Sequence, residues 1–257
     1  MTTVRMSELT WVEYQKRLVD DEPIVILPTG SVEQHGPHLP LATDTMIPEM
    51  VAEAVAERIG AIVATPLAYG YKSQPKSGGG NHFPGTTSLD GHTYSSILRD
   101  VIRELARHGV RKLAVIDGHM ENAMFLVEGI DLGLRELRYG GVEDMRIVKL
   151  GYWEFISQAT EEALFPDGLL SWALEHGAVM ETSVMLHLRP DLVRADLIPD
   201  NPPADFPPYD VYPTDIRPIP PSGVLSSAAP ASAAKGKVVF DQVVEDIAAA
   251  LPGAFET

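Results

Sequence analysis

Two short stretches of the chain each place a carboxylate and an imidazole two residues apart. Glu33 and His35 stand in "EQH", and His119 and Glu121 stand in "HME" in the opposite order. Each stretch directly follows a short apolar run of the kind that forms a buried strand. In an extended backbone, residues i and i+2 point the same way and lie about 6 to 7 Å apart. If the two strand ends are neighbours, the pairs could converge on two metal ions about 4 Å apart, with Asp44 as a bridging carboxylate.

A structural interpretation of these residues has to be weighed against the metal interpretation. A single Glu-x-His pair is more often a surface pair or a helix cap than a metal site. Two inverted pairs, each beside a glycine at an expected strand end, favour the metal interpretation. Three carboxylates together with a hydroxide would also offset the charge of two divalent ions. His38 is either a partner behind the ligands or a loop histidine that only forms a hydrogen bond.

A third titratable group lies in "LEHGAVMETSVML", which contains Glu175, His176 and Glu181. On a helix, His176 would lie apart from the strand-end residues. We therefore expect it to transfer protons rather than to bind a metal. The alternative is a histidine that is satisfied in the core or at an interface.

Aromatic and glycine-rich stretches suggest where a substrate would bind. Trp153 follows the fourth apolar run, and Trp172 lies one helical turn before His176. Two indole faces could enclose a flat, partly cationic ring, although each tryptophan taken alone would suit core packing. Ser77, in "KSGGGNHFPGTTSLDG", could form a hydrogen bond with a substrate or belong to a surface loop. The chain lacks a phosphate-binding P-loop, a dinucleotide fingerprint and a Gly-x-Ser-x-Gly nucleophile motif.

The elements that must position these residues alternate between strands and helices. The apolar runs lack strict alternation, as is typical of strands covered on both faces. This order predicts an α/β fold with a largely parallel sheet, and ligands in such folds bind beyond the carboxyl ends of the strands. The expected strands lie in 23–30, 61–70, 112–118 and 145–153, and the expected helices lie in 47–60, 91–109 and 122–141.

We expect a single domain, 1–257, because the sequence shows no internal repeat and no sign of a second domain. Thr10 and Glu13 have the spacing of a capping box at the start of a helix. Residues 199–230 hold ten of the 21 prolines, which is too many for a helix or an internal strand. Because aromatic residues are interleaved with these prolines, we expect an ordered loop packed on the domain or on a neighbouring subunit. Residues 237–251 form a final strand or helix.

The composition narrows the possible partners. The formal charge of −16, from 36 acids against 20 bases, opposes binding to nucleic acid or to an anionic membrane surface. A neutral or cationic small molecule is the easier partner. The chain has no cysteine, no apolar segment of signal-peptide length at its start and no run of eighteen apolar residues. We expect a cytoplasmic protein.

Taken together, these stretches resemble the creatininase family of metal-dependent amidohydrolases. The resemblance is carried by "LPTGSVEQHGPHLPLATD", "YGYKSQPKSGGGNHFPGTTSLDG", "GHMENAMFLVEGIDLGLRELRY", "YWEF" and "WALEHGAVMETSVML", and it extends through "PPADFPPYDVYP". It therefore covers nearly the whole chain. The resemblance implies a three-layer α/β/α sandwich that assembles as a homohexamer.

The resemblance also implies two divalent metal ions per chain, either zinc with manganese or two zincs. One ion would be held by Glu33, Asp44 and His119, and the other by His35, Asp44 and Glu121. His176 would be the acid/base group. In the leading hypothesis it is helped by Glu175 or a neighbouring acid, and Glu121 is both a ligand and part of the catalytic set. Ser77, Met120, Trp153 and Trp172 would surround the substrate.

The implied reaction is the reversible hydrolysis of a cyclic amide, creatinine to creatine, by a hydroxide that bridges the metals. Met120 stands where creatininases have a tyrosine that lines the pocket, and Asp117 replaces the usual asparagine in the same turn. These departures bear on the choice of substrate. The alternatives are a related amidohydrolase, deformylase or peptidase acting on another amide, and a metal-stabilised oligomeric binding protein without catalysis.

Overall fold

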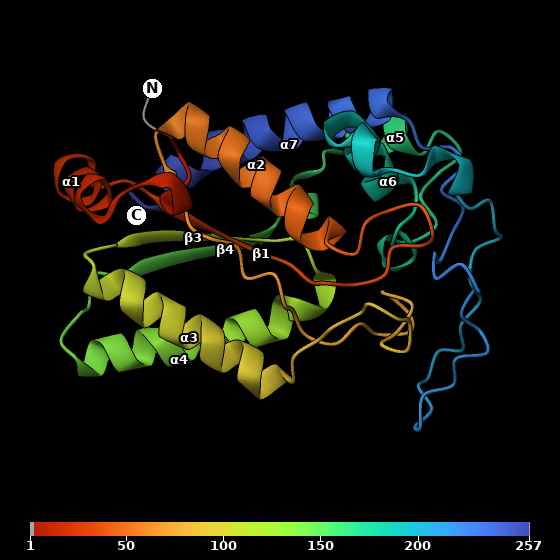
Figure 1. Ribbon diagram of the computed structural model, residues 1–257, viewed down its shortest axis with the longest axis horizontal. Coiled ribbons are helices and arrows are strands. Elements are labelled where there is room, and N and C mark those ends of the chain that lie inside the picture. Colours follow the sequence, from red (N-terminus) through yellow and green to blue (C-terminus); the bar gives the residue numbers. More distant parts are fainter. Residues whose placement is uncertain (1–2, 257) are drawn as a thin grey trace.

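The computed structural model describes residues 3–256, and these form a four-stranded, all-parallel sheet (Figure 1). The strand order is β2-β1-β3-β4. The two central strands pair directly, with Thr29 opposite Asp117, so the chain leaves both strands at the same edge of the sheet. The sequence-based expectation of neighbouring strand ends is therefore confirmed. The strands are β1 (Val25–Thr29), β2 (Ile62–Val63), β3 (Lys112–Asp117) and β4 (Arg146–Gly151).

Helices cover both faces of the sheet, which confirms the α/β/α layering. In Figure 1, α2 and α7 lie above the sheet and α3 and α4 lie below it, with α6 beside one end of α7. Each face has its own apolar core, one including Ile47 and Val243 and the other including Leu98 and Leu126. The α-helices are α1 (Trp11–Asp21), α2 (Thr43–Ile59), α3 (Gly91–Arg107), α4 (Ala123–Tyr139), α5 (Gln158–Leu164), α6 (Val179–Leu188) and α7 (Ala233–Ala254).

Local sequence signals account for where several helices begin and end. Thr10 and Glu13 form the expected capping box at the start of α1. Helix α2 ends at Ile59 and is capped by Gly60, whose φ of 72° is a left-handed conformation that glycine adopts without strain. On α3, the buried residues Leu98, Ile102 and Leu105 repeat at helical spacing and turn one face of the helix into the core.

One segment is shorter than the sequence predicts, and another takes one of two structures that the sequence left open. The run 61–70 forms a strand of only two residues, after which the chain pairs with the end of β1 through Gly30 N–H and the Leu67 carbonyl, 3.0 Å apart. Pro66 lacks an N–H, which limits a longer ladder here. The segment 237–251, left open between strand and helix, lies within α7.

Residues 199–230 contain no helix or strand in the described structure. The segment is tied to the domain by backbone bonds such as Ala204 N–H to the Leu225 carbonyl, and by Lys76, whose ammonium group contacts Asp210. Phe206 is half-buried, but Tyr209 and Tyr212 are 63% and 78% exposed.

Within residues 3–256, no helix is both long enough and apolar enough to cross a membrane.

Candidate metal centre

Two glycines allow the ends of β1 and β3 to approach the first turn of α2. A Cβ atom on Gly30 would lie 2.3 Å from the Asp44 carbonyl oxygen, and one on Gly118 would lie 2.1 Å from the same atom. Neither position therefore has room for a side chain. The close approach brings Asp44 between the two strand ends, each of which is followed within a few residues by a carboxylate and a histidine.

Asp44 lies between the two histidines and offers one oxygen to each. Its Oδ1 lies 2.7 Å from His35 Nε2, and its Oδ2 lies 3.0 Å from His119 Nδ1. The same nitrogen of His119 lies 2.9 Å from Glu33 Oε2 and 3.4 Å from Glu121 Oε2. All five candidate ligands from the sequence therefore meet in one buried cluster.

The other ring nitrogen of each histidine forms a hydrogen bond with a backbone carbonyl. His35 Nδ1 lies 3.1 Å from the Glu33 carbonyl, and His119 Nε2 lies 2.9 Å from the Tyr71 carbonyl. Because a carbonyl oxygen only accepts, these nitrogens must carry the proton. In the neutral rings, the lone pairs of His35 Nε2 and His119 Nδ1 therefore face carboxylates. Such backbone contacts commonly orient histidines that bind metals.

The cluster fits metal ions because its buried acceptors converge without bonding one another. Among the described residues, Glu33 Oε2, Asp44 Oδ2 and His35 Nε2 are buried and lack a hydrogen-bond partner. Their short approaches to neighbouring groups do not have hydrogen-bond geometry. Acceptors that face a common point are satisfied by a cation, and neutral imidazole with carboxylate suits zinc or manganese.

Potential ligand atoms form two groups of three, one inside this cluster and one that extends beyond it. Glu33, Asp44 and His119 form one group, and this set agrees with the first ion predicted from the sequence. The second group is His35, His176 and Glu181, whose ligand atoms lie within 4.8 Å of one another. It shares only His35 with the second predicted ion. The sequence alone gives Glu181 no role, because its nearness to His35 depends on tertiary structure.

Burial and mutual attraction shift the pKa values in this cluster strongly. Burial opposes a charge on both histidines, but the surrounding carboxylates raise the pKa of His35 and of His119 well above the usual value. Burial raises the pKa of Glu33 to about 7. For Asp44, burial acts in the same direction, but the two histidines outweigh it and hold the pKa below its usual range. The carboxylates thus favour a positive charge at the positions where cations would bind.

Asp117 lies behind the cluster rather than in it. Its Oδ1 accepts hydrogen bonds from the Thr29 hydroxyl at 2.8 Å and the Asn122 amide at 3.0 Å. It also accepts one from the backbone N–H of His119 at 3.3 Å. Burial raises the pKa of Asp117 to about 6. This carboxylate therefore fixes the turn that presents His119 and Glu121.

His176 is not on a helix, which corrects the sequence-based interpretation. It lies in the turn before α6, and its ring centroid is 4.3 Å from that of His35. Trp172 begins a separate 3-10 helix, Trp172–Leu174, rather than the preceding turn of one continuous helix. The glycine that follows, Gly177, has a φ of 63°, which breaks the helical pattern that the sequence suggested. His176 therefore lies against the ligand cluster instead of apart from it.

The surroundings of His176 lower its pKa, so the ring is uncharged, and those of the neighbouring Glu175 raise the pKa of its carboxyl group. Burial and the nearby His35 lower the pKa of His176 well below its usual value. Burial raises the pKa of Glu175 to about 7, although this side chain accepts a bond from Met180 N–H at 3.0 Å. A neutral imidazole beside a carboxyl that titrates near neutrality is suited to proton transfer.

A small cavity of about 50 Å³ adjoins the cluster. Its wall includes all four residues that the sequence assigned to the substrate: Ser77, Met120, Trp153 and Trp172. Ser77 donates a hydrogen bond of 2.5 Å to Glu121 Oε1, and Met120 is 39% exposed.

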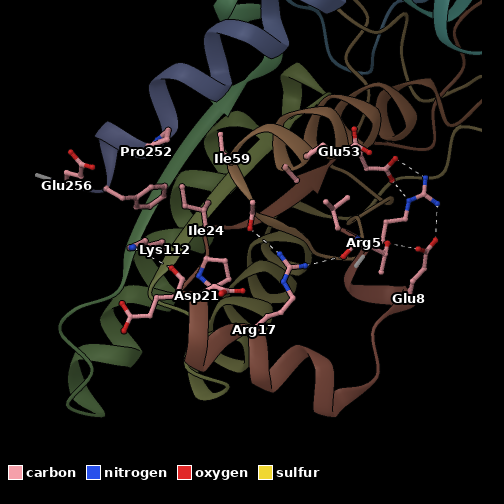
Figure 2. Close-up of a pocket in the computed structure, with 18 residues that line it drawn as sticks. Arg5, Glu8, Arg17, Asp21, Ile24, Glu53, Ile59, Lys112, Pro252 and Glu256 are labelled. Carbon is pink, nitrogen blue, oxygen red and sulfur yellow. Dashed lines mark hydrogen bonds and ion pairs between the residues drawn. The ribbon is translucent and has the colours of Figure 1, made fainter. Parts of the chain in front are cut away.

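A larger cavity, of about 1130 Å³, is lined by none of the residues of this cluster. Figure 2 shows this cavity and its lining side chains. Its lining includes the residues before β1 and the C-terminal end of α2. Arg17 is committed to the carbonyls of Gly60 and Ala61, and Arg5 to Glu53 and Glu8. This mixed-charge cavity contains none of the chemistry of the ligand cluster, so its volume does not identify the active site.

A three-layer α/β/α fold with two adjoining groups of buried imidazole and carboxylate ligands, beside the carboxyl ends of its central strands, defines a binuclear metallohydrolase. Residues 7–251 match the family model Creatininase, described as creatinine amidohydrolase. The chain belongs to the creatininase family.

Known members of this family are similar over nearly all or about two thirds of the chain. The creatinine amidohydrolase of Pseudomonas putida is 53% identical over 254 residues, which are 98% of each chain. A mycofactocin precursor peptide peptidase of Mycolicibacterium smegmatis is 35% identical over 68% of this chain and 61% of its own length. Solved creatininases include a Zn–Zn form of a mutant, a manganese form, and a mutant complexed with creatine. Each is 52% identical and covers both chains fully, with TM-scores of 0.97, 0.97 and 0.96.

Proposed function

We propose that this protein hydrolyses creatinine to creatine, reversibly, with two divalent metal ions per chain. The observation that carries the proposal is the buried cluster of two histidines and three carboxylates at the ends of β1 and β3. This cluster lies in a chain 53% identical to a creatinine amidohydrolase. The substrate's flat, partly cationic guanidino ring also suits a chain with a net charge of −16.

Asp44 would hold both ions in this proposal. Glu33 and His119 would complete one position, while His35 and Glu121 would complete the other. The support for a bridge is that the two Asp44 oxygens approach different histidines, at 2.7 and 3.0 Å. Zinc with manganese, or two zincs, would suit these ligands, and zinc and manganese forms are known for similar creatininases. The ions would supply an activated water and polarise the ring carbonyl.

His176 moves the proton that the reaction requires. Its neutral ring accepts a proton from the attacking water and then passes it to the ring nitrogen as the amide bond breaks. Glu175 assists this transfer from the adjacent position. The support is the position of His176 on the cavity wall together with a pKa well below the usual value.

The cavity wall binds the substrate. Trp153 and Trp172 enclose the flat ring, and cationic guanidino groups are attracted to indole faces. Ser77 forms a hydrogen bond with the substrate and, through its bond to Glu121, keeps that carboxylate oriented. Met120 completes the wall with a polarisable but non-donating side chain.

Metal removal is the direct test of this function. Protein stripped by a chelator is expected to form no creatine from creatinine, and reloading with zinc or manganese should restore activity at two ions per chain. The two measurements are creatine formation and metal content. Uptake of two ions without creatine formation would redirect the search to other amides, including peptides such as those processed by the mycofactocin peptidases. A protein that binds two ions and hydrolyses no amide would be a binding protein, and failure to bind metal would refute the site.

Replacing Met120 with tyrosine is expected to strengthen creatinine binding. A hydroxyl in the cavity wall adds a hydrogen-bond donor, and one such bond contributes about 1 kcal/mol, so KM should fall about fivefold. Metal content should remain at two ions per chain, because the contacts of His119 and Glu121 do not involve the Met120 side chain. Met120→Leu serves as the control without a hydroxyl. Equal KM values in the two variants would show that this position does not select the substrate.

A homohexamer and a cytoplasmic location complete the proposal. The support for assembly is a set of large apolar side chains that this chain leaves exposed, including Tyr209, Val211 and Tyr212 in the proline-rich segment and Trp11 on α1. The cysteine-free composition fits a reducing compartment. Light scattering of the metal-loaded protein measures the number of chains.

A further inference from the structure

Gln34 separates two candidate ligands in the sequence, and the proposed mechanism gives it no role. Its side chain is 6% exposed and lies among three segments that are distant in sequence. The amide nitrogen lies 3.0 Å from the Gly78 carbonyl and 2.9 Å from the Gly223 carbonyl. The amide oxygen accepts a hydrogen bond from Gly36 N–H at 2.9 Å. One side chain therefore joins three segments: the glycine-rich loop that contains Gly78, the proline-rich segment 199–230, and the loop after β1 that carries Glu33 and His35.

The backbone around Gln34 is shaped to receive this amide. A Cβ atom on Gly79 would lie 2.7 Å from Gln34 Nε2. A Cβ atom on Gly223, whose φ is 80°, would lie 2.0 Å from Gln34 Oε1. Because both contacting positions are glycines, the two segments close directly on the amide. Such contacts indicate that the fold forms a specific buried site for this amide, and not a chance hydrogen bond at the surface.

The same residue determines which nitrogen of His176 carries the proton. His176 Nε2 lies 2.7 Å from the backbone carbonyl of Gln34, and a carbonyl only accepts. Nε2 therefore donates. The Gln34 amide has two hydrogens, and the carbonyls of Gly78 and Gly223 take both of them. Its 2.9 Å approach to His176 Nε2 then adds no further hydrogen bond, because neither nitrogen has a free acceptor site in this tautomer. Nδ1 remains as the nitrogen that can accept and release a proton.

We propose that Gln34 is a positioning residue for proton transfer, and this inference rests on the proposed function. Its backbone carbonyl sets the tautomer and orientation of His176. Its side-chain amide holds the glycine-rich loop, which carries Ser77, and the proline-rich segment against that ring. Gln34 touches neither substrate nor metal in this arrangement, and it acts through the residues that do.

Gln34→Met tests the side chain because methionine keeps the length and cannot donate. We expect kcat to fall about 10- to 100-fold, the usual effect of losing a partner that orients an active-site group. KM should stay within about threefold, because His176 acts in the transition state rather than in substrate binding. Metal content should stay at two ions per chain. Hydrogen exchange should increase in both 73–80 and 220–226, since both lose the same donor.

Asn201→Ala is the matched control. The Asn201 amide donates to the Val224 carbonyl at 3.2 Å, so it ties the same segment one residue from Gly223. This variant should speed exchange in 220–226 and leave kcat within about twofold, because no catalytic group is displaced. An unchanged kcat in Gln34→Met, or a loss of rate that metal loss fully explains, would overturn the inference.

A third measurement does not depend on activity or on a Gln34 variant. In zinc-loaded protein labelled with 15N, the His176 ring should show a proton on Nε2 and none on Nδ1. The signal is assigned by its disappearance in His176→Ala. A proton on Nδ1 would overturn the inference. If the unmodified protein fails to hydrolyse creatinine, the proposed function fails, while the ring signal and the exchange in the two segments still test the role of Gln34.

Discussion

Replacement of Asp44 with asparagine is expected to remove metal from both positions and to lower kcat for creatinine by at least about 10³-fold. The reason is geometric, because one Asp44 oxygen approaches His35 and the other approaches His119. An asparagine side chain keeps one acceptor and turns a donor towards the second position. It also removes one of the negative charges that offset the two ions.

Metal analysis and steady-state kinetics on the same preparation measure both effects of Asp44→Asn. Asp131→Asn is a suitable control, since that carboxylate is exposed on α4 and pairs with Arg135 across one helical turn. The control should keep two ions per chain and normal turnover. Retention of both ions by Asp44→Asn would show that the two positions do not share this ligand.

Replacement of His176 with alanine should lower kcat about 10²- to 10⁴-fold, the range expected for a general acid/base, while the protein keeps two ions per chain. The low pKa of His176, caused by burial and by His35, leaves the ring neutral and able to accept a proton at pH 7. The result decides between two roles that the geometry allows, because the ligand atoms of His176, His35 and Glu181 also form a group that could hold a metal.

Metal content is again the deciding measurement. If His176→Ala loses one ion per chain, His176 is a ligand and the second position is built from His35, His176 and Glu181. Glu181→Gln then provides the matched comparison, since Glu181 Oε2 lies 3.7 Å from His35 Nε2 and accepts a bond from Gly177 N–H at 2.6 Å. Under the acid/base assignment, both variants keep two ions.

The sequence predicted the layered fold because its signals are local. Apolar runs, capping residues and closing glycines marked three of the four strands and the main helices close to their observed bounds. The pairs Glu33/His35 and His119/Glu121 were recognisable for the same reason, since their spacing and their position after a strand are visible in the chain itself. The second strand is shorter than its apolar run, because only two of its residues pair with β1 and Pro66 has no N–H with which to continue the ladder.

What the sequence alone determined about this protein is the set of chemical groups and the edge of the sheet at which they gather. Only the tertiary structure decided how they combine. It turned Asp44 between two histidines, brought His176 and Glu181 against His35, and closed two glycine-containing segments on Gln34. These contacts join residues from 9 to 189 positions apart. Their geometry depends on how helices and loops pack together, and local sequence patterns carry no information about that packing.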